Sequence, residues 1–263
     1  VVSVSMLRTA GAEAARERRF GGEEAWAAQT AAWLRSQGFN GLGAWSDTAR
    51  LRAAPTKLVY TAIWNFMSSY GRKRGGTYQL PGHTGYPKDA IFVFDPEFET
   101  FCDEHARQLT ATKDDPWLLG HFTDNELPLR REALVNYLAL PETDPGFKAA
   151  QAFLRERRGP GATVKDITEA DREAFLALVV DRYLSIVTRA IRKYDPNHLI
   201  LGSRFHGAGL RYPELFRAAG RHLDVVAVNY YHAWTPDPER MAMWERESGR
   251  PFMVTEWYAK GMD

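Results

Sequence analysis

Short apolar runs alternate with longer amphipathic segments along most of this chain. The apolar runs predict strands at residues 1–6, 39–45, 58–64, 117–123, 199–203, 225–229 and 252–255. Helical spacing and cap residues between them predict helices from Gly22 to Gly38 and at 95–109, 169–194, 213–219 and 238–248. Continuous apolar strands that alternate with helices are typical of a parallel sheet covered on both faces. The pattern therefore predicts an α/β fold of seven β-then-α units.

Two stretches interrupt this alternation. Residues 67–89 are rich in Gly, Tyr and Lys/Arg with few helical signals, which predicts a long loop, and loops of this length usually have a function. Residues 127–168 follow the fourth predicted strand and contain only short helical patches. We therefore expect one domain over residues 1–263, with an insertion at about 127–168.

The length of 263 residues is typical of an eight-stranded (β/α) barrel, the TIM barrel. Polar and aromatic residues follow nearly every predicted strand, and the active site of a barrel lies at these carboxyl ends. A doubly wound dinucleotide fold fits less well, because the run from Gly41 to Ser46 lacks the third glycine of its fingerprint. The chain stops after the seventh strand. We therefore expect a (β/α)8 barrel whose eighth strand is missing from this chain.

Composition removes several classes of protein. The formal net charge of +1 gives no overall attraction to nucleic acid or to an anionic membrane, and no apolar run is long enough to span a bilayer. Cys102 is the one cysteine, so an intrachain disulfide is impossible. The 7 histidines show no paired ligand spacing, and no phosphate-binding loop or serine-nucleophile motif is present. We expect no metal and no cofactor.

Two carboxylates end predicted strands on opposite sides of the expected barrel mouth. Glu126 closes the run Thr123-Asp124-Asn125-Glu126 after the fourth strand, and Glu256 follows the seventh strand in Val254-Thr255-Glu256-Trp257. Taken singly, the first is better explained by a loop with a helix cap and the second by a surface ion pair. Together they can place a glycosidic bond between an acid and a nucleophile.

Aromatic and polar side chains at the same ends suit a sugar site. Trp and Tyr offer a flat apolar face to a pyranose ring and a polar edge to its hydroxyls. Packing is the alternative explanation for these residues. The expected substrate-binding residues are Trp45, Trp64, Asn125, His206, Asn229, Tyr231, His232, Trp234 and Trp257.

The motifs Thr123-Asp124-Asn125-Glu126-Leu127-Pro128 and Val254-Thr255-Glu256-Trp257 resemble retaining glycoside hydrolases of clan A. The resemblance implies that Glu126 is the acid/base and Glu256 the nucleophile. It implies that Asn125 binds the sugar hydroxyl beside the anomeric carbon, and that Tyr231 supports the nucleophile. Within the clan, the runs 38–47, 124–127 and 137–141 are most similar to the agarases of family 50. An Arg that many members carry after the second strand is replaced here by Trp45-Ser46-Asp47.

The function that the resemblance implies is hydrolysis of a β-linked galactan such as agarose, by a two-glutamate double displacement with retention. The partner would be a polysaccharide or oligosaccharide, which favours a secreted or periplasmic protein. Two alternatives remain open at this point: a β-galactosidase acting on small galactosides, and a barrel that binds carbohydrate without hydrolysing it. An aldolase or metal-dependent hydrolase ranks third, since it would need a catalytic Lys or a ligand cluster on the strand ends, and only Lys260, beyond the seventh strand, is present.

Overall fold

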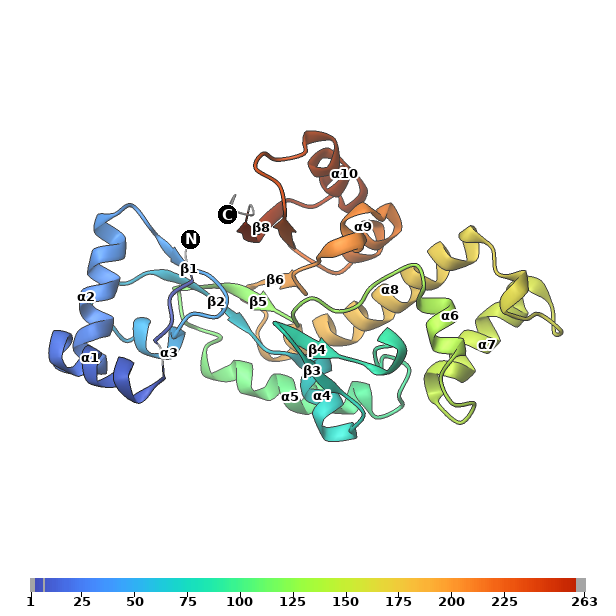
Figure 1. Ribbon diagram of the computed structural model, residues 1–263, viewed down its shortest axis with the longest axis horizontal. Helices are drawn as coiled ribbons and strands as arrows, with labels where there is room; N and C mark the ends of the chain where they lie inside the picture. The colour runs from blue at the N-terminus through green and yellow to red at the C-terminus, as the bar shows by residue number, and fades with distance from the viewer. Residues whose placement is uncertain (1–2, 7, 259–263) are drawn as a thin grey trace.

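A computed structural model describes residues 3–6 and 8–258 of the protein. In this part of the chain, six parallel strands follow one another in sequence order (Figure 1). They are β1 (Gly41–Leu42), β2 (Val59–Ile63), β5 (Leu118–Phe122), β6 (Leu199–Gly202), β7 (Val226–Tyr231) and β8 (Phe252–Tyr258). The first four form one sheet and the last two another, and a parallel bridge between Phe205 and Val228 joins the two sheets.

Helices lie outside this run of strands, as Figure 1 shows. The α-helices are α1 (Ala10–Phe20), α2 (Glu23–Ser36), α3 (Thr48–Leu51), α4 (Phe66–Arg74), α5 (Phe98–Ala106), α6 (Ala133–Leu138), α7 (Pro145–Arg158), α8 (Glu169–Tyr194), α9 (Pro213–Gly220) and α10 (Pro238–Ser248). Short 3-10 turns are η1 (Pro87–Asp89), η2 (Arg107–Ala111), η3 (Val164–Asp166) and η4 (Gly207–Arg211). An antiparallel hairpin consists of β3 (Tyr78–Leu80) and β4 (His83–Gly85).

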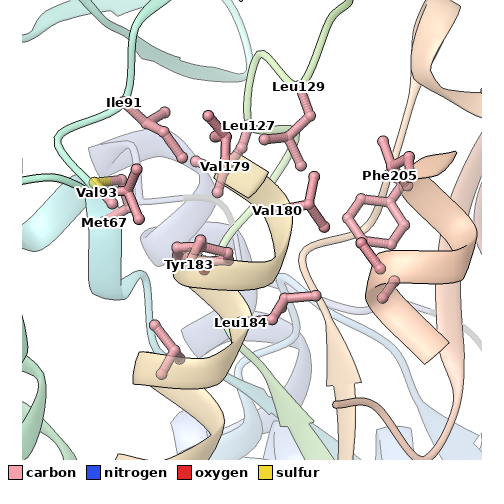
Figure 2. Close-up of a cluster of buried hydrophobic side chains, with 14 of the residues drawn as sticks. Met67, Ile91, Val93, Leu127, Leu129, Val179, Val180, Tyr183, Leu184 and Phe205 are labelled. Carbon is pink, nitrogen blue, oxygen red and sulfur yellow. The ribbon is translucent and has the colours of Figure 1, made fainter. Parts of the chain in front are cut away.

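Helix α8 organises the main hydrophobic core. It begins with a capping box, in which Thr168 and Asp171 satisfy each other's free backbone N–H groups. One face then buries apolar side chains at helical spacing, including Val179, Val180 and Tyr183. Figure 2 shows this face packed against Met67 of α4, against Leu127 and Leu129 of the segment after β5, and against Phe205. The helix therefore fixes the segment that follows β5.

The N-terminal prediction was wrong in two respects. Residues 3–6 form no strand, because the Val4 N–H is donated to the Ser46 side chain, at 3.1 Å, rather than to a backbone carbonyl. Val1 and Val2 lie outside the described residues. The Ala- and Arg-rich stretch that follows is helix α1, which is absent from the predicted helices; Thr9 caps it at the N-terminus. Six parallel strands are therefore described where seven were predicted.

The stretch predicted as a loop at 67–89 also contains regular structure. Helix α4 occupies its first part and the β3–β4 hairpin its second. The sequence around α4 lacks a local cap, since Asn65 makes no side-chain cap bond. Its first turn is held instead by Asp124, a residue 56 or more positions away, so no local pattern could reveal the helix. In the segment 127–168, the short helical patches are α6, α7 and η3.

In the described part of the chain, no helix has both the length and the apolar character needed to cross a bilayer.

Candidate functional site

A cleft of about 720 Å³ opens at the carboxyl ends of β5, β7 and β8. The β3–β4 hairpin and helix α4 form its other walls. The cleft is lined by Trp45, Asn65, Ser68, Arg72, Gln79, Pro81, Gly82, His83, Thr84, Asn125, Glu126, Tyr231, Glu256 and Tyr258. A larger groove of about 1050 Å³ between α2 and α3 contains none of the predicted site residues. The cleft therefore brings together both predicted glutamates.

Glu126 projects into this cleft from a constrained backbone. Its φ of 51° lies in the left-handed region, which is unfavourable for a side chain other than Gly. Its N–H is held by the Ser203 carbonyl at 3.0 Å. Its Oε1 accepts two hydrogen bonds of 2.8 Å, from Asn229 Nδ2 and from the Tyr231 hydroxyl. The carboxylate is thus fixed by both backbone and side-chain contacts.

Glu256 reaches the same place because of a bulge in β8. Val228 pairs with Val254, but the next residue of β7, Asn229, pairs with Glu256, so Thr255 is skipped. The Thr255 hydroxyl donates to Asn229 Oδ1 at 2.9 Å. This bond orients the amide so that Nδ2 faces the carboxylates, at 3.5 Å from Glu256 Oε2. One amide nitrogen therefore contacts both glutamates.

Arg204 is the site residue whose role the sequence did not reveal. Its side chain is 1% exposed, at the end of β6, and its Nη2 donates to Glu256 Oε2 at 2.7 Å. Its Nη1 donates to Asn125 Oδ1 at 2.8 Å. The sequence signal was the strand-end run Arg204-Phe205-His206, since a buried cation at a strand end requires an anionic partner. The Arg expected after the second strand is absent, and this guanidinium comes from a different strand.

Asn125 and Tyr231 both line the cleft and have protein partners there. The Asn125 amide uses Oδ1 for Arg204 and Nδ2 for the Gly82 carbonyl, at 3.3 Å. The Tyr231 hydroxyl donates to Glu126, the expected acid/base, at 2.8 Å. Burial and the nearby carboxylates raise the pKa of Tyr231 above its ordinary value, so its hydroxyl remains a donor at neutral pH.

Asp124 lies beneath the cleft and holds helix α4. Its carboxylate is 1% exposed and accepts the N–H groups of Met67 at 2.7 Å and Ser68 at 3.1 Å. The Tyr183 hydroxyl donates to it at 2.7 Å. Burial raises the pKa of Asp124 to about 6, although these hydrogen bonds oppose the shift. Asp124 thus connects the Glu126 segment to the wall that carries Ser68 and Arg72.

Two histidines flank Glu126. His83 Nδ1 lies 3.9 Å from Glu126 Oε2, and the rings of His83 and His206 are 6.0 Å apart. Burial lowers the pKa of His206, so its ring is mainly neutral at neutral pH, while the charge of Glu126 opposes this shift. His206 Nδ1 is buried with no hydrogen-bond partner in the described part of the chain.

The predicted aromatic residues divide into two groups. Trp45 and Tyr231 line the cleft. Trp64 does not, and its indole N–H donates to His121 Nδ1 at 2.9 Å in the protein's interior. The other aromatic and histidine candidates lie outside the lining: His232 contacts Tyr258, Trp257 donates to the Ala233 carbonyl, and Trp234 is 72% exposed.

One buried cluster, His121, Asp195 and His198, has a composition that suits a metal ion. Trp64 can only donate, so His121 Nδ1 is the acceptor and Nε2 carries the proton. That proton points at Asp195, 2.8 Å away, which leaves His121 no lone pair for a cation. The cluster therefore fits a hydrogen-bonded structural network that connects β5 with the start of β6.

Curated sequences and solved structures of known proteins are similar to this chain. Two curated proteins of Vibrio sp. (strain JT0107), β-agarase B and β-agarase A, are 25% and 26% identical to the chain over 94% and 93% of its length. The chain is similar to β-agarases. A solved structure described as BpGH50 is 25% identical with a TM-score of 0.81 over 97% of this agarase-like chain. An agarase, AgWH50C, is 24% identical with a TM-score of 0.72 over 94% of it.

These relatives are longer than the agarase-like chain. It spans 29% and 28% of the two Vibrio proteins, 58% of BpGH50 and 38% of AgWH50C. No family model matches the sequence. The predicted resemblance to family 50 agarases is confirmed, and the likeness to AgWH50C concerns the fold.

Proposed function

We propose that this chain forms the catalytic centre of a retaining glycoside hydrolase that cleaves a β-linked galactan such as agarose. The observation that carries the proposal is the position of Asn229 Nδ2, 2.8 Å from Glu126 Oε1 and 3.5 Å from Glu256 Oε2. Glu126 Oε1 and Glu256 Oε2 are therefore at most about 6.3 Å apart, which is the sum of the two distances. Retaining enzymes separate their carboxyl groups by about 5–5.5 Å, and inverting enzymes by about 6.5–9.5 Å.

The two carboxylates have the surroundings that their proposed roles require. Glu126 Oε1 accepts from both Asn229 and Tyr231, so the proton of its acid form belongs on Oε2, toward the cleft. From there it can pass to the leaving glycosidic oxygen. Arg204 and Asn229 bind Glu256 Oε2 and orient the carboxylate for attack on the anomeric carbon. Glu126 would then deprotonate the water that hydrolyses the glycosyl-enzyme.

The proposed architecture is a (β/α)8 barrel, of which the described residues supply six parallel strands. Six consecutive parallel strands with a cleft at their carboxyl ends support it. A cavity of about 140 Å³ separates residues of β1 and β2 from Met253, Val254 and Thr255 of β8. The two ends of the strand series therefore face each other across a narrow space.

The proposal is tested by incubating the protein with agarose and measuring new reducing ends, beside Glu256→Gln and Glu126→Gln variants. We expect release by the wild type, none by Glu256→Gln, and a reduction of at least 100-fold for Glu126→Gln. Proton NMR of the first product should show the β-anomer. Binding without release would indicate a carbohydrate-binding protein, and release only from an aryl β-galactoside would indicate a small-galactoside enzyme.

A further inference from the structure

Arg72 stands out among the residues that line the cleft. It lies in the last turn of α4, and its Nη2 donates to the Ser69 hydroxyl of the same helix at 2.7 Å. Within residues 3–6 and 8–258, no carboxylate forms an ion pair with it. The guanidinium has five N–H donors in a fixed plane, so most of its donor capacity is unused.

The neighbouring cations of the helix are arranged differently. Arg74 forms ion pairs with Asp95 and with Asp144, the latter at 2.9 Å. Lys73 lies over the Phe101 ring, 5.7 Å from its centroid, and does not line the cleft. Favourable interaction with the carboxyl end of a helix explains basic residues in this turn, but it does not explain why one of them lines the cleft.

Arg72 is also distinct from the other cation at the site. Arg204 is buried and occupied by Glu256 and Asn125. Arg72 is exposed and lines the cleft, as do the neutral polar residues Ser68, Gln79 and Thr84 and the two glutamates. An exposed guanidinium with unused donors is suited to an oxyanion, which it can bind through two parallel hydrogen bonds.

We propose that Arg72 forms a subsite for an anionic substituent of the galactan, a sulfate ester or a carboxylate. This inference rests on the proposed function, since it specifies the substrate class of the same cleft. The anion would be carried by a sugar held between α4 and the β3–β4 hairpin, while the scissile bond lies at Glu126 and Glu256. A neutral agarose chain would leave Arg72 without a charged partner.

The test compares three oligosaccharides of equal length: neutral agarose, a sulfated galactan and a galactan bearing a carboxylate as a pyruvate ketal. Each is assayed with wild type, Arg72→Gln and Lys73→Gln. Both substitutions remove one positive charge from the same turn, so Lys73→Gln controls for the long-range electrostatic effect of losing a positive charge near the cleft. We expect Arg72→Gln to lower the ratio of kcat/KM for an anionic over the neutral substrate by roughly tenfold, and Lys73→Gln to leave this ratio unchanged.

The anionic substrate whose kcat/KM falls on Arg72→Gln identifies the anion that Arg72 binds. An equal effect of Arg72→Gln on all three substrates, or an equal effect of both variants, would overturn the proposal. Failure of the proposed function is distinguishable, because calorimetric binding of the three oligosaccharides in a Glu256→Gln background does not require turnover. A loss of anionic preference on Arg72→Gln in that background supports the subsite even if no substrate is hydrolysed. The absence of such a loss rejects it.

Discussion

Arg204 Nη2 donates to Glu256 Oε2 across 2.7 Å, from a side chain that is 1% exposed to one that is 45% exposed. The cation is therefore the fixed partner, held by the interior, and the carboxylate is the partner that reaches the cleft. A buried guanidinium without this carboxylate would be costly, so the pair couples folding to the position of Glu256.

Arg204→Lys should retain the charge but lose the planar fork that binds Asn125 and Glu256 together. We expect kcat/KM on agarose to fall roughly 10- to 100-fold, the equivalent of one or two charge-assisted hydrogen bonds. The control is Arg189→Lys, which alters an exposed pair with Glu99 and should have no effect. Wild-type rates for Arg204→Lys would show that the guanidinium does not position Glu256.

Asn229→Asp changes the group shared by the two glutamates with almost no change in volume. It replaces a donor, 2.8 Å from Glu126, by a third negative charge. Because like charges repel and both carboxylates lose a hydrogen bond, we expect a decrease in kcat of roughly 100-fold or more. Circular dichroism should show an intact fold. Asn136→Asp in α6, away from the cleft, is the matched substitution, and a similar decrease there would contradict the role of Asn229.

Asp124 should make stability depend on pH in an unusual direction. Its pKa rises from 3.8 to about 6 on folding, so the native state holds this proton more tightly than the unfolded chain does. Protonated Asp124 stabilises the folded protein by on the order of 3 kcal/mol below pH 4, and this stabilisation is lost as the pH rises to about 6. Subtracting the unfolding free energy of Asp124→Asn from that of the wild type should give a difference that falls between pH 4 and pH 7. A flat or rising difference would show that the carboxyl does not titrate in this way.

Gly220 allows α9 to approach the end of α10. A Cβ there would lie 1.9 Å from the Ser248 carbonyl oxygen, which belongs to the backbone and cannot move aside cheaply. Gly220→Ala should lower the free energy of unfolding by about 1–3 kcal/mol or more in urea denaturation. In contrast, a Cβ on Gly11 in α1 meets nothing within 4 Å, so Gly11→Ala should be neutral or stabilising. Equal behaviour of the two variants would refute the packing argument.

Much of the α/β alternation could be predicted, because buried parallel strands are apolar over their whole length. The β5, β6 and β7 predictions differ from the observed strands by at most two residues at either end. Helix α4 could not be predicted, since its N-terminal cap comes from Asp124 across the fold. The proposed carboxylates were visible as strand-end residues. Their environment depends on the bulge at Thr255, which has no local signature, and on Arg204, whose position at a strand end does not reveal its burial or its partners.

The aromatic predictions show the same limit. Trp45 and Trp64 both follow short apolar strands, but Trp45 lines the cleft and Trp64 donates inward to His121. Which way such a side chain points depends on backbone conformation: Trp45 has a φ of 65°. A left-handed residue other than Gly is not recognisable from sequence spacing.

The two proposed catalytic glutamates belong to different sheets. Glu126 follows a strand of the four-stranded sheet, Glu256 lies in the two-stranded sheet, and Phe205 joins them through hydrogen bonds with Ala227 and Asn229 of 2.9 and 2.8 Å. Backbone hydrogen bonds from Asp224 and Val225 to the Ile200 carbonyl, of 3.0 and 3.4 Å, also connect β6 to the segment before β7. The Phe205 ring packs on Phe216 of α9, with centroids 6.1 Å apart. Helix α9, which contributes no residue to the cleft lining, thereby supports the residue that joins the two sheets.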